Sequence, residues 1–138
     1  MNKAAQQPLT KGVHHVGLTV PSVSETAAFF TEALGYQVVG EKQDYPAVFV
    51  SDGTTMLTLW QAKTSDPVSF DRHGNVGLHH FAIAVESVTQ LETLYPKIAD
   101  YPGVEIEFSP ESLGGLPVKH MMCCIPGGIR MELIATGS

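Results

Sequence analysis

The chain has 138 residues, of which 43% are apolar, and its formal charge is −6 at pH 7. A chain of this length is expected to form one domain with its own hydrophobic core. It has no basic stripe that would bind nucleic acid and no apolar run long enough to cross a membrane. Its polar first residues do not resemble a secretory signal. Its only two cysteines, Cys123 and Cys124, are adjacent and cannot form a disulfide framework. We therefore expect a soluble, cytoplasmic protein that binds neither nucleic acid nor membranes.

The first half of the chain predicts a strand, a helix and three further strands. Residues 14–20 alternate in the manner of a half-buried strand. Ser22 and Glu25 match the capping box that begins a helix, apolar residues continue it at helical spacing, and Gly35 ends it. The further strands are expected at 36–41, 47–50 and 55–61, with a tight turn at 51–53.

The second half repeats this pattern. Residues 79–85 resemble residues 14–20, Ser87 and Gln90 form a second capping-box pattern, and Gly103 is expected to end the second helix. Strands should follow at 104–108, 118–125 and 129–135, with a turn at 126–128. We predict an α+β fold, a single domain over 1–138, in which βαβββ modules at 12–61 and 78–135 are joined by a linker at 62–77.

The repeat predicts which side chains share a face. Alternate residues of a strand point the same way, so His15 and His80 should lie opposite the apolar residues that face the helices. On the last strand of each half, Thr58 and Glu132 face the same way as these histidines. A pseudo-twofold arrangement would gather these four positions, and His15, His80 and Glu132 are able to bind a metal.

Two imidazoles and one carboxylate suit Fe²⁺, Mn²⁺, Zn²⁺, Ni²⁺ or Co²⁺. Three protein ligands leave room for water or substrate, as a catalytic site requires. A histidine on a strand is more often an ordinary hydrogen-bonded residue, but the equivalent places of His15 and His80 in the repeat favour one divalent-metal site. His14 and His79 are expected to face away from the metal.

These segments resemble the vicinal oxygen chelate superfamily, which includes glyoxalase I, methylmalonyl-CoA epimerase, extradiol dioxygenases, and fosfomycin and bleomycin resistance proteins. The resemblance covers about residues 12 to 135 and rests on four segments: 15–20, 28–36, 80–85 and 126–133. It implies paired modules whose mixed or antiparallel sheets curl around a metal-bearing cavity, with metal positions at His15, Thr58, His80 and Glu132. It also implies a small-molecule substrate whose vicinal oxygens bind the metal, and a homodimer.

The chain departs from the superfamily's patterns in three places. Thr58 stands where glyoxalase-like and epimerase members carry Glu or Gln, so a carboxylate base is missing there. Met122 stands where the dioxygenases carry a tyrosine, and Gly17 where the fosfomycin enzymes carry a threonine. The resemblance implies a metal-dependent lyase or isomerase of the glyoxalase type. The alternatives are an Fe²⁺ extradiol-type dioxygenase, a thiol transferase and a drug-binding resistance protein.

Four further residues are expected at the pocket. His120, Met122 and Cys124 share one face of a strand, which the resemblance places at the cavity. His120 is either the general acid and base, acting with Glu132 as the catalytic pair, or a residue that only hydrogen-bonds at the start of its strand. Trp60 forms a wall for the substrate or packs in the core or at a dimer contact, and Cys124 borders the pocket or is an inert buried thiol.

Overall fold

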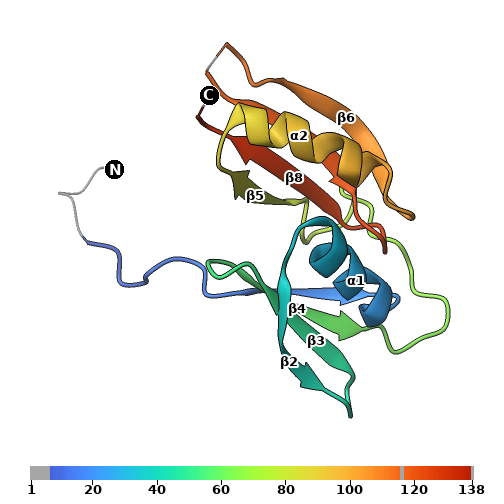
Figure 1. The fold of residues 1–138 in the computed structure, drawn as a ribbon. Coiled ribbons are helices and arrows are strands. Elements are labelled where there is room, and N and C mark those ends of the chain that lie inside the picture. Colours follow the sequence, from blue (N-terminus) through green and yellow to red (C-terminus); the bar gives the residue numbers. More distant parts are fainter. Residues whose placement is uncertain (1–6, 116, 138) are drawn as a thin grey trace.

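The computed structural model describes residues 7–115 and 117–137. These residues form two modules, each a four-stranded sheet with one helix, in the predicted order of one strand, one helix and three strands (Figure 1). Module 1 comprises β1 (Val16–Val20), α1 (Val23–Ala33), β2 (Gln37–Lys42), β3 (Ala47–Ser51) and β4 (Met56–Gln61). Module 2 comprises β5 (Phe81–Val85), α2 (Val88–Ala99), β6 (Glu105–Ser112), β7 (Lys119–Cys124) and β8 (Arg130–Ala135). The α+β class with two βαβββ modules is confirmed.

The strand order is the same in both sheets. It is β1-β4-β3-β2 in module 1 and β5-β8-β7-β6 in module 2. The first and last strands of each module pair in parallel, and the remaining pairs are antiparallel. In the parallel pairs Gly17 aligns with Thr58, and Ala82 aligns with Glu132. Thr58 and Glu132 therefore occupy equivalent places in the two modules, each beside the first strand of its own module.

Both helices begin at the predicted serines. The Ser22 hydroxyl accepts a hydrogen bond from the Glu25 amide at 3.2 Å, and Ser87 accepts one from the Gln90 amide at 3.0 Å. These contacts satisfy amides that have no partner within the first turn of a helix.

Two predicted boundaries differ in module 2. Helix α2 ends at Ala99 instead of reaching Gly103, because Pro102 cannot continue a helix and disfavours helical geometry in the residue before it. Strand β6 continues to Ser112, beyond the predicted end at residue 108. Register shifts against β7 on either side of Phe108 let this edge strand accommodate Pro110.

The two modules share one hydrophobic core. A single cluster of buried residues joins Leu57 and Leu59 of module 1 to Met121 and Leu133 of module 2. Helix α1 lies toward module 2 in Figure 1, and its Phe29 ring meets the Tyr101 ring edge to face at a centroid distance of 5.3 Å. Neither helix in the described ranges has the length and apolar character of a membrane-crossing segment.

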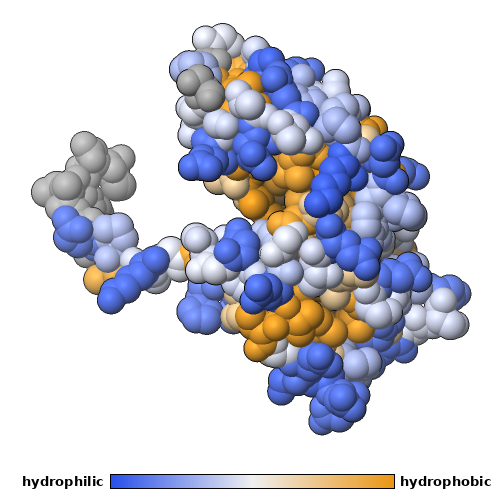
Figure 2. All heavy atoms as spheres, in the orientation of Figure 1, coloured by the Kyte–Doolittle hydropathy of each residue, from blue (hydrophilic) through white to orange (hydrophobic). Residues whose placement is uncertain are grey.

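The two sheets do not close around a common cavity. Among the described residues they are separate four-stranded sheets, and the modules meet through the shared core. On the faces opposite the helices, Gly17 and Thr19 of module 1 and Ala82 and Ala84 of module 2 are exposed. Figure 2 shows apolar surface in the hollow between the modules and over part of module 1, with hydrophilic residues around it.

A buried hydrogen bond links α1 to the turn between β7 and β8. The Thr26 hydroxyl donates to the Pro126 carbonyl at 3.0 Å, and Thr26 is only 1% exposed. Replacing Thr26 with Val keeps the side-chain shape but leaves the buried carbonyl without this donor. We expect Thr26→Val to lower the free energy of unfolding in urea by about 1–3 kcal/mol. Thr93→Val, on the exposed face of α2, is the control, and an equal loss in both variants would contradict this role of Thr26.

Candidate metal centre

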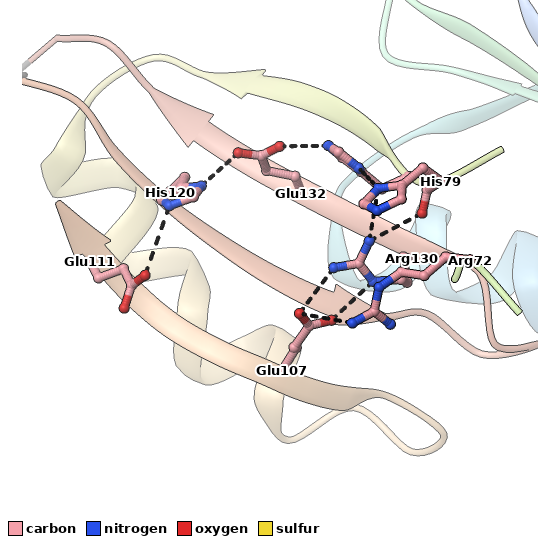
Figure 3. Close-up of polar contacts among 8 residues, drawn as sticks. Arg72, His79, Glu107, Glu111, His120, Arg130 and Glu132 are labelled. Atoms are coloured by element: carbon pink, nitrogen blue, oxygen red, sulfur yellow. Dashed lines mark hydrogen bonds and ion pairs between the residues drawn. The ribbon is translucent and has the colours of Figure 1, made fainter. Parts of the chain in front are cut away.

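A continuous chain of polar contacts crosses the face of the module 2 sheet opposite α2 (Figure 3). Each link joins side chains that are neighbours in this order: Glu111, His120, Glu132, His80, His79, Arg130, Glu107 and Arg72.

Glu132 of β8 is the centre of this chain. Its carboxylate is almost removed from water, since the residue is 9% exposed. Oε1 lies 3.1 Å from His80 Nε2, and Oε2 lies 2.6 Å from His120 Nδ1. The sheet register explains the convergence: Ala82 and Met122 flank Glu132 on the neighbouring strands, and each histidine precedes its flanking residue by two positions on the same face.

The His80 ring is oriented by its sequence neighbour. His79 Nδ1 lies 2.8 Å from His80 Nδ1 and 3.2 Å from Arg130 Nη1. A guanidinium only donates hydrogen bonds, so the tautomers that fit both contacts have His79 Nδ1 as the shared acceptor and the proton of His80 on Nδ1. His80 Nε2 is then the atom that faces Glu132. Local desolvation and the Arg130 charge lower the pKa of His79, in keeping with a neutral acceptor. His79 was expected only to face away from the metal, and the structure adds a direct contact between its ring and that of His80.

Arg130, Glu107 and Arg72 form an ionic cluster that the sequence analysis did not identify. Arg130 binds Glu107 through two parallel hydrogen bonds, Nε to Oε1 at 3.0 Å and Nη2 to Oε2 at 3.0 Å. Arg72 Nη2 lies 3.9 Å from Glu107 Oε2. The hydrogen bonds from Arg130, and then the charges of both arginines, lower the pKa of Glu107. Alternation along β8 places Arg130 on the same face as Glu132, so the sequence pattern could have identified Arg130 as a neighbour of the site. No such pattern points to Arg72, which lies far from β8 in the sequence.

Module 1 carries an aromatic wall at the position equivalent to Glu132. Thr58 is 4% exposed, and its hydroxyl accepts a hydrogen bond from Trp60 Nε1 at 2.9 Å. The indole meets the rings of Tyr45 and Phe49 at centroid distances of 4.7 and 5.8 Å. Gly17 leaves space for it, because a Cβ there would lie 3.1 Å from Thr58 Oγ1 and 3.4 Å from Trp60 Nε1. The hydroxyl of Thr58 is thus engaged in holding Trp60 in place.

His15 lies apart from the other two predicted ligands. It is exposed just before β1, and its Nδ1 is 2.9 Å from His14 Nδ1, which repeats the His79–His80 pair. Within residues 7–115 and 117–137, no group of three or more His, Cys, Asp or Glu side chains is close enough to hold a metal ion. One chain therefore brings together His80, Glu132 and His120, but not His15.

The remaining predicted pocket residues lie on β7. Met122 is 6% exposed and pairs with Glu132. Cys124 is half-buried beside Arg130, and burial is the main cause that raises the pKa of its thiol. Cys123 lies on the opposite, core-facing side, where burial raises its pKa to about 12. Neither thiol has the lowered pKa of a reactive cysteine.

His80 Nε2 and Glu132 Oε1 are the atoms best placed to hold a divalent ion. Two ligand atoms each about 2.1 Å from one ion, at about 90° to each other, are about 3.0 Å apart. The observed 3.1 Å fits this spacing, and imidazole with carboxylate suits first-row divalent metals. The His120 contact leaves Glu132 Oε1 available, since it engages the other oxygen.

Comparisons with known proteins agree with this architecture. Residues 12–133 match the family model of the Glyoxalase/Bleomycin resistance protein/Dioxygenase superfamily. A 2-epi-5-epi-valiolone epimerase from Actinomyces sp is 27% identical over 150 residues, which cover 92% of this chain and 80% of that protein.

Two solved structures share the fold. A glyoxylase/bleomycin resistance protein/dioxygenase domain from Frankia sp. EAN1pec has a TM-score of 0.79 and 22% identity, covering 91% of this chain and 92% of its own. A lactoylglutathione lyase from Agrobacterium tumefaciens has a TM-score of 0.69 and 18% identity, covering 93% and 96%. The family match spans both modules and the strands that carry Glu132 and His120, and the chain belongs to the Glyoxalase/Bleomycin resistance protein/Dioxygenase superfamily.

Proposed function

We propose that this protein is a metal-dependent isomerase of the epimerase type, which moves a proton at a carbon next to a metal-bound oxygen of a small molecule. The observation that carries the proposal is the buried Glu132 carboxylate with one imidazole on each oxygen. His80 and Glu132 would hold the ion, which would supply Lewis-acid stabilisation of negative charge on the substrate. Similarity to an epimerase, across most of the chain, favours this reaction type within the superfamily.

His120 is the group that we propose moves the proton. Glu132 Oε2 accepts a hydrogen bond from its Nδ1 at 2.6 Å, so the tautomer that fits leaves Nε2 able to accept a proton. The ring is half-buried against Phe108 at a centroid distance of 4.9 Å, which limits its orientation. In module 1 the hydroxyl of Thr58 already accepts from Trp60, so an imidazole on β7 is the better base.

We further propose that the metal site is completed by His15 of a second copy of the chain. His15 is exposed just before β1, two positions before the small Gly17, and it is the second member of a histidine pair equivalent to the pair His79–His80. The two sheets are separate, and apolar surface lies in the hollow between the modules and over part of module 1 (Figure 2). A symmetric dimer would bring module 1 of one copy to module 2 of the other.

A second candidate is an Fe²⁺ dioxygenase. Two histidines and one carboxylate are the ligand set of many non-haem iron oxygenases, and His15, His80 and Glu132 match it in type. The apolar Met122 beside Glu132 offers no group for proton transfer, whereas His120 does. The isomerase is therefore the preferred function.

The metal site is tested by titrating metal-free protein with Zn²⁺, Mn²⁺, Co²⁺, Ni²⁺ and, without oxygen, Fe²⁺. We expect His80→Gln and Glu132→Gln each to weaken binding of the preferred ion by about 100-fold or more, because each removes a ligand atom. His73→Gln, an exposed linker histidine, should bind as the wild type does. Far-UV circular dichroism checks the fold, and unchanged affinity in folded Glu132→Gln would refute the assignment.

The sharing of the site is tested by mixing two inactive variants. His15→Ala and Glu132→Ala should each lack metal sites alone, whereas refolding them together should restore about a quarter of the sites, since half of randomly paired dimers are mixed and each mixed dimer has one intact site. Metal content after gel filtration is the measurement. If all three ligands came from one chain, no mixture would regain metal.

The role of His120 is tested with 2-epi-5-epi-valiolone in deuterated water. We expect wild-type protein to exchange a carbon-bound proton for deuterium, and His120→Gln to slow this by about 10²- to 10⁴-fold while keeping its metal. NMR of the product measures the exchange. His73→Gln, the same replacement at an exposed histidine between the modules, is the control and should exchange at the wild-type rate. Full exchange by metal-loaded His120→Gln would contradict the proposed base.

A further inference from the structure

We propose that a cavity beside the candidate metal centre binds a small organic anion, a carboxylate or phosphate ester with an apolar body, whose charge is held by Arg72 and Arg130. This site goes beyond the proposed function, and its occupation does not require the metal.

The cavity lies where three parts of the chain meet. Its volume is about 440 Å³, and its walls come from β1, from the segment 62–80 that connects β4 to β5, and from the turn between β7 and β8. Apolar side chains line much of it, among them Leu18, Phe70, Leu78 and Ile129. Cavities of about 300–1,000 Å³ with apolar walls and a few convergent polar groups are the usual form of small-molecule sites.

Both charged side chains that line this cavity are arginines. Arg72 and Arg130 both line it, and Glu107 is the carboxylate that contacts them. Each nitrogen of the Arg130 guanidinium is engaged: Nε and Nη2 by Glu107, and Nη1 by the Nδ1 and the carbonyl oxygen of His79. Glu107 contacts both guanidiniums but is not itself among the lining residues, so the charge presented at the cavity wall is positive.

Arg72 is the group that would meet the ligand. Its ion pair with Glu107 spans 3.9 Å, which is too long for a hydrogen bond, and its side chain is 32% exposed. A guanidinium offers a planar fork of donors that matches a carboxylate or phosphate through paired hydrogen bonds. Glu107, locked by Arg130, fixes the position of this fork without using its hydrogen bonds (Figure 3). The chain has a formal charge of −6, so the cationic wall formed by Arg72 and Arg130 differs in sign from the protein as a whole.

The test is calorimetry and ¹H–¹⁵N NMR titration of full-length protein freed of metal, with three probes that share one ring. Phenyl phosphate and benzoate carry the anion, and benzyl alcohol is neutral. We expect both anions to bind at least about tenfold more tightly than benzyl alcohol, with chemical shifts changing around Phe70 and Leu78. Inorganic phosphate should bind more weakly than phenyl phosphate, because it lacks the apolar body.

Three variants separate recognition by charge from a structural effect. Arg72→Gln should weaken phenyl phosphate binding by about tenfold or more, whereas Lys97→Gln, which removes one positive charge on α2 outside the cavity, should not. Glu107→Gln should tighten binding severalfold, because it removes the competing carboxylate, whereas mere disruption of the cluster would weaken it.

Equal binding of benzyl alcohol and phenyl phosphate, or unchanged binding by Arg72→Gln, would overturn the proposal. Because the protein is metal-free, these results are independent of the metal titrations of His80→Gln and Glu132→Gln. Failure of one site therefore does not count against the other.

Discussion

A carboxylate held out of water between two imidazoles is the constraint on which the rest of this site depends. Glu132 is the one acidic residue that is buried in the described part of the chain, and an isolated carboxylate there would be strongly unfavourable. His120 Nδ1 donates a hydrogen bond to one oxygen, and His80 Nε2 lies 3.1 Å from the other, where the proposed ion would offset the charge. The parallel pairing of β5 with β8 and the antiparallel pairing of β7 with β8 provide these neighbours, so the architecture of the module and the chemistry of the site have one origin.

The two modules have diverged at their equivalent positions. Module 2 has Glu132 and a polar chain, whereas module 1 has Thr58, whose hydroxyl fixes the indole of Trp60. The small Gly17 beside it leaves room for that indole, since a Cβ there would lie 3.4 Å from Trp60 Nε1, and the small Ala82 holds the equivalent place beside Glu132. On the proposed function, module 2 supplies His80, Glu132 and His120, whereas module 1 supplies an apolar wall and, from a second copy, the ligand His15.

The sequence predicted the order of elements and the faces of the strands, because alternation and capping are local properties. Thr58, Trp60 and Glu132 therefore lie on the expected faces. The placement of one sheet against the other is not local, so the relation of His15 to His80 could not be derived in this way. The contacts of the linker could not be predicted for the same reason. The ion pair of Arg72 with Glu107 depends on the conformation of an irregular segment, which has no periodic sequence pattern.

The contact between His79 and His80 has a thermodynamic consequence. Arg130 contacts His79, His79 contacts His80 Nδ1, and His80 Nε2 lies 3.1 Å from Glu132 Oε1, so the cationic wall and the candidate metal centre are joined by a continuous series of polar contacts. If binding at one site changes the affinity of the other, the coupling free energy between the two sites is the same in both directions. Whatever factor an anion at Arg72 imposes on affinity for a metal, the metal must impose on affinity for the anion.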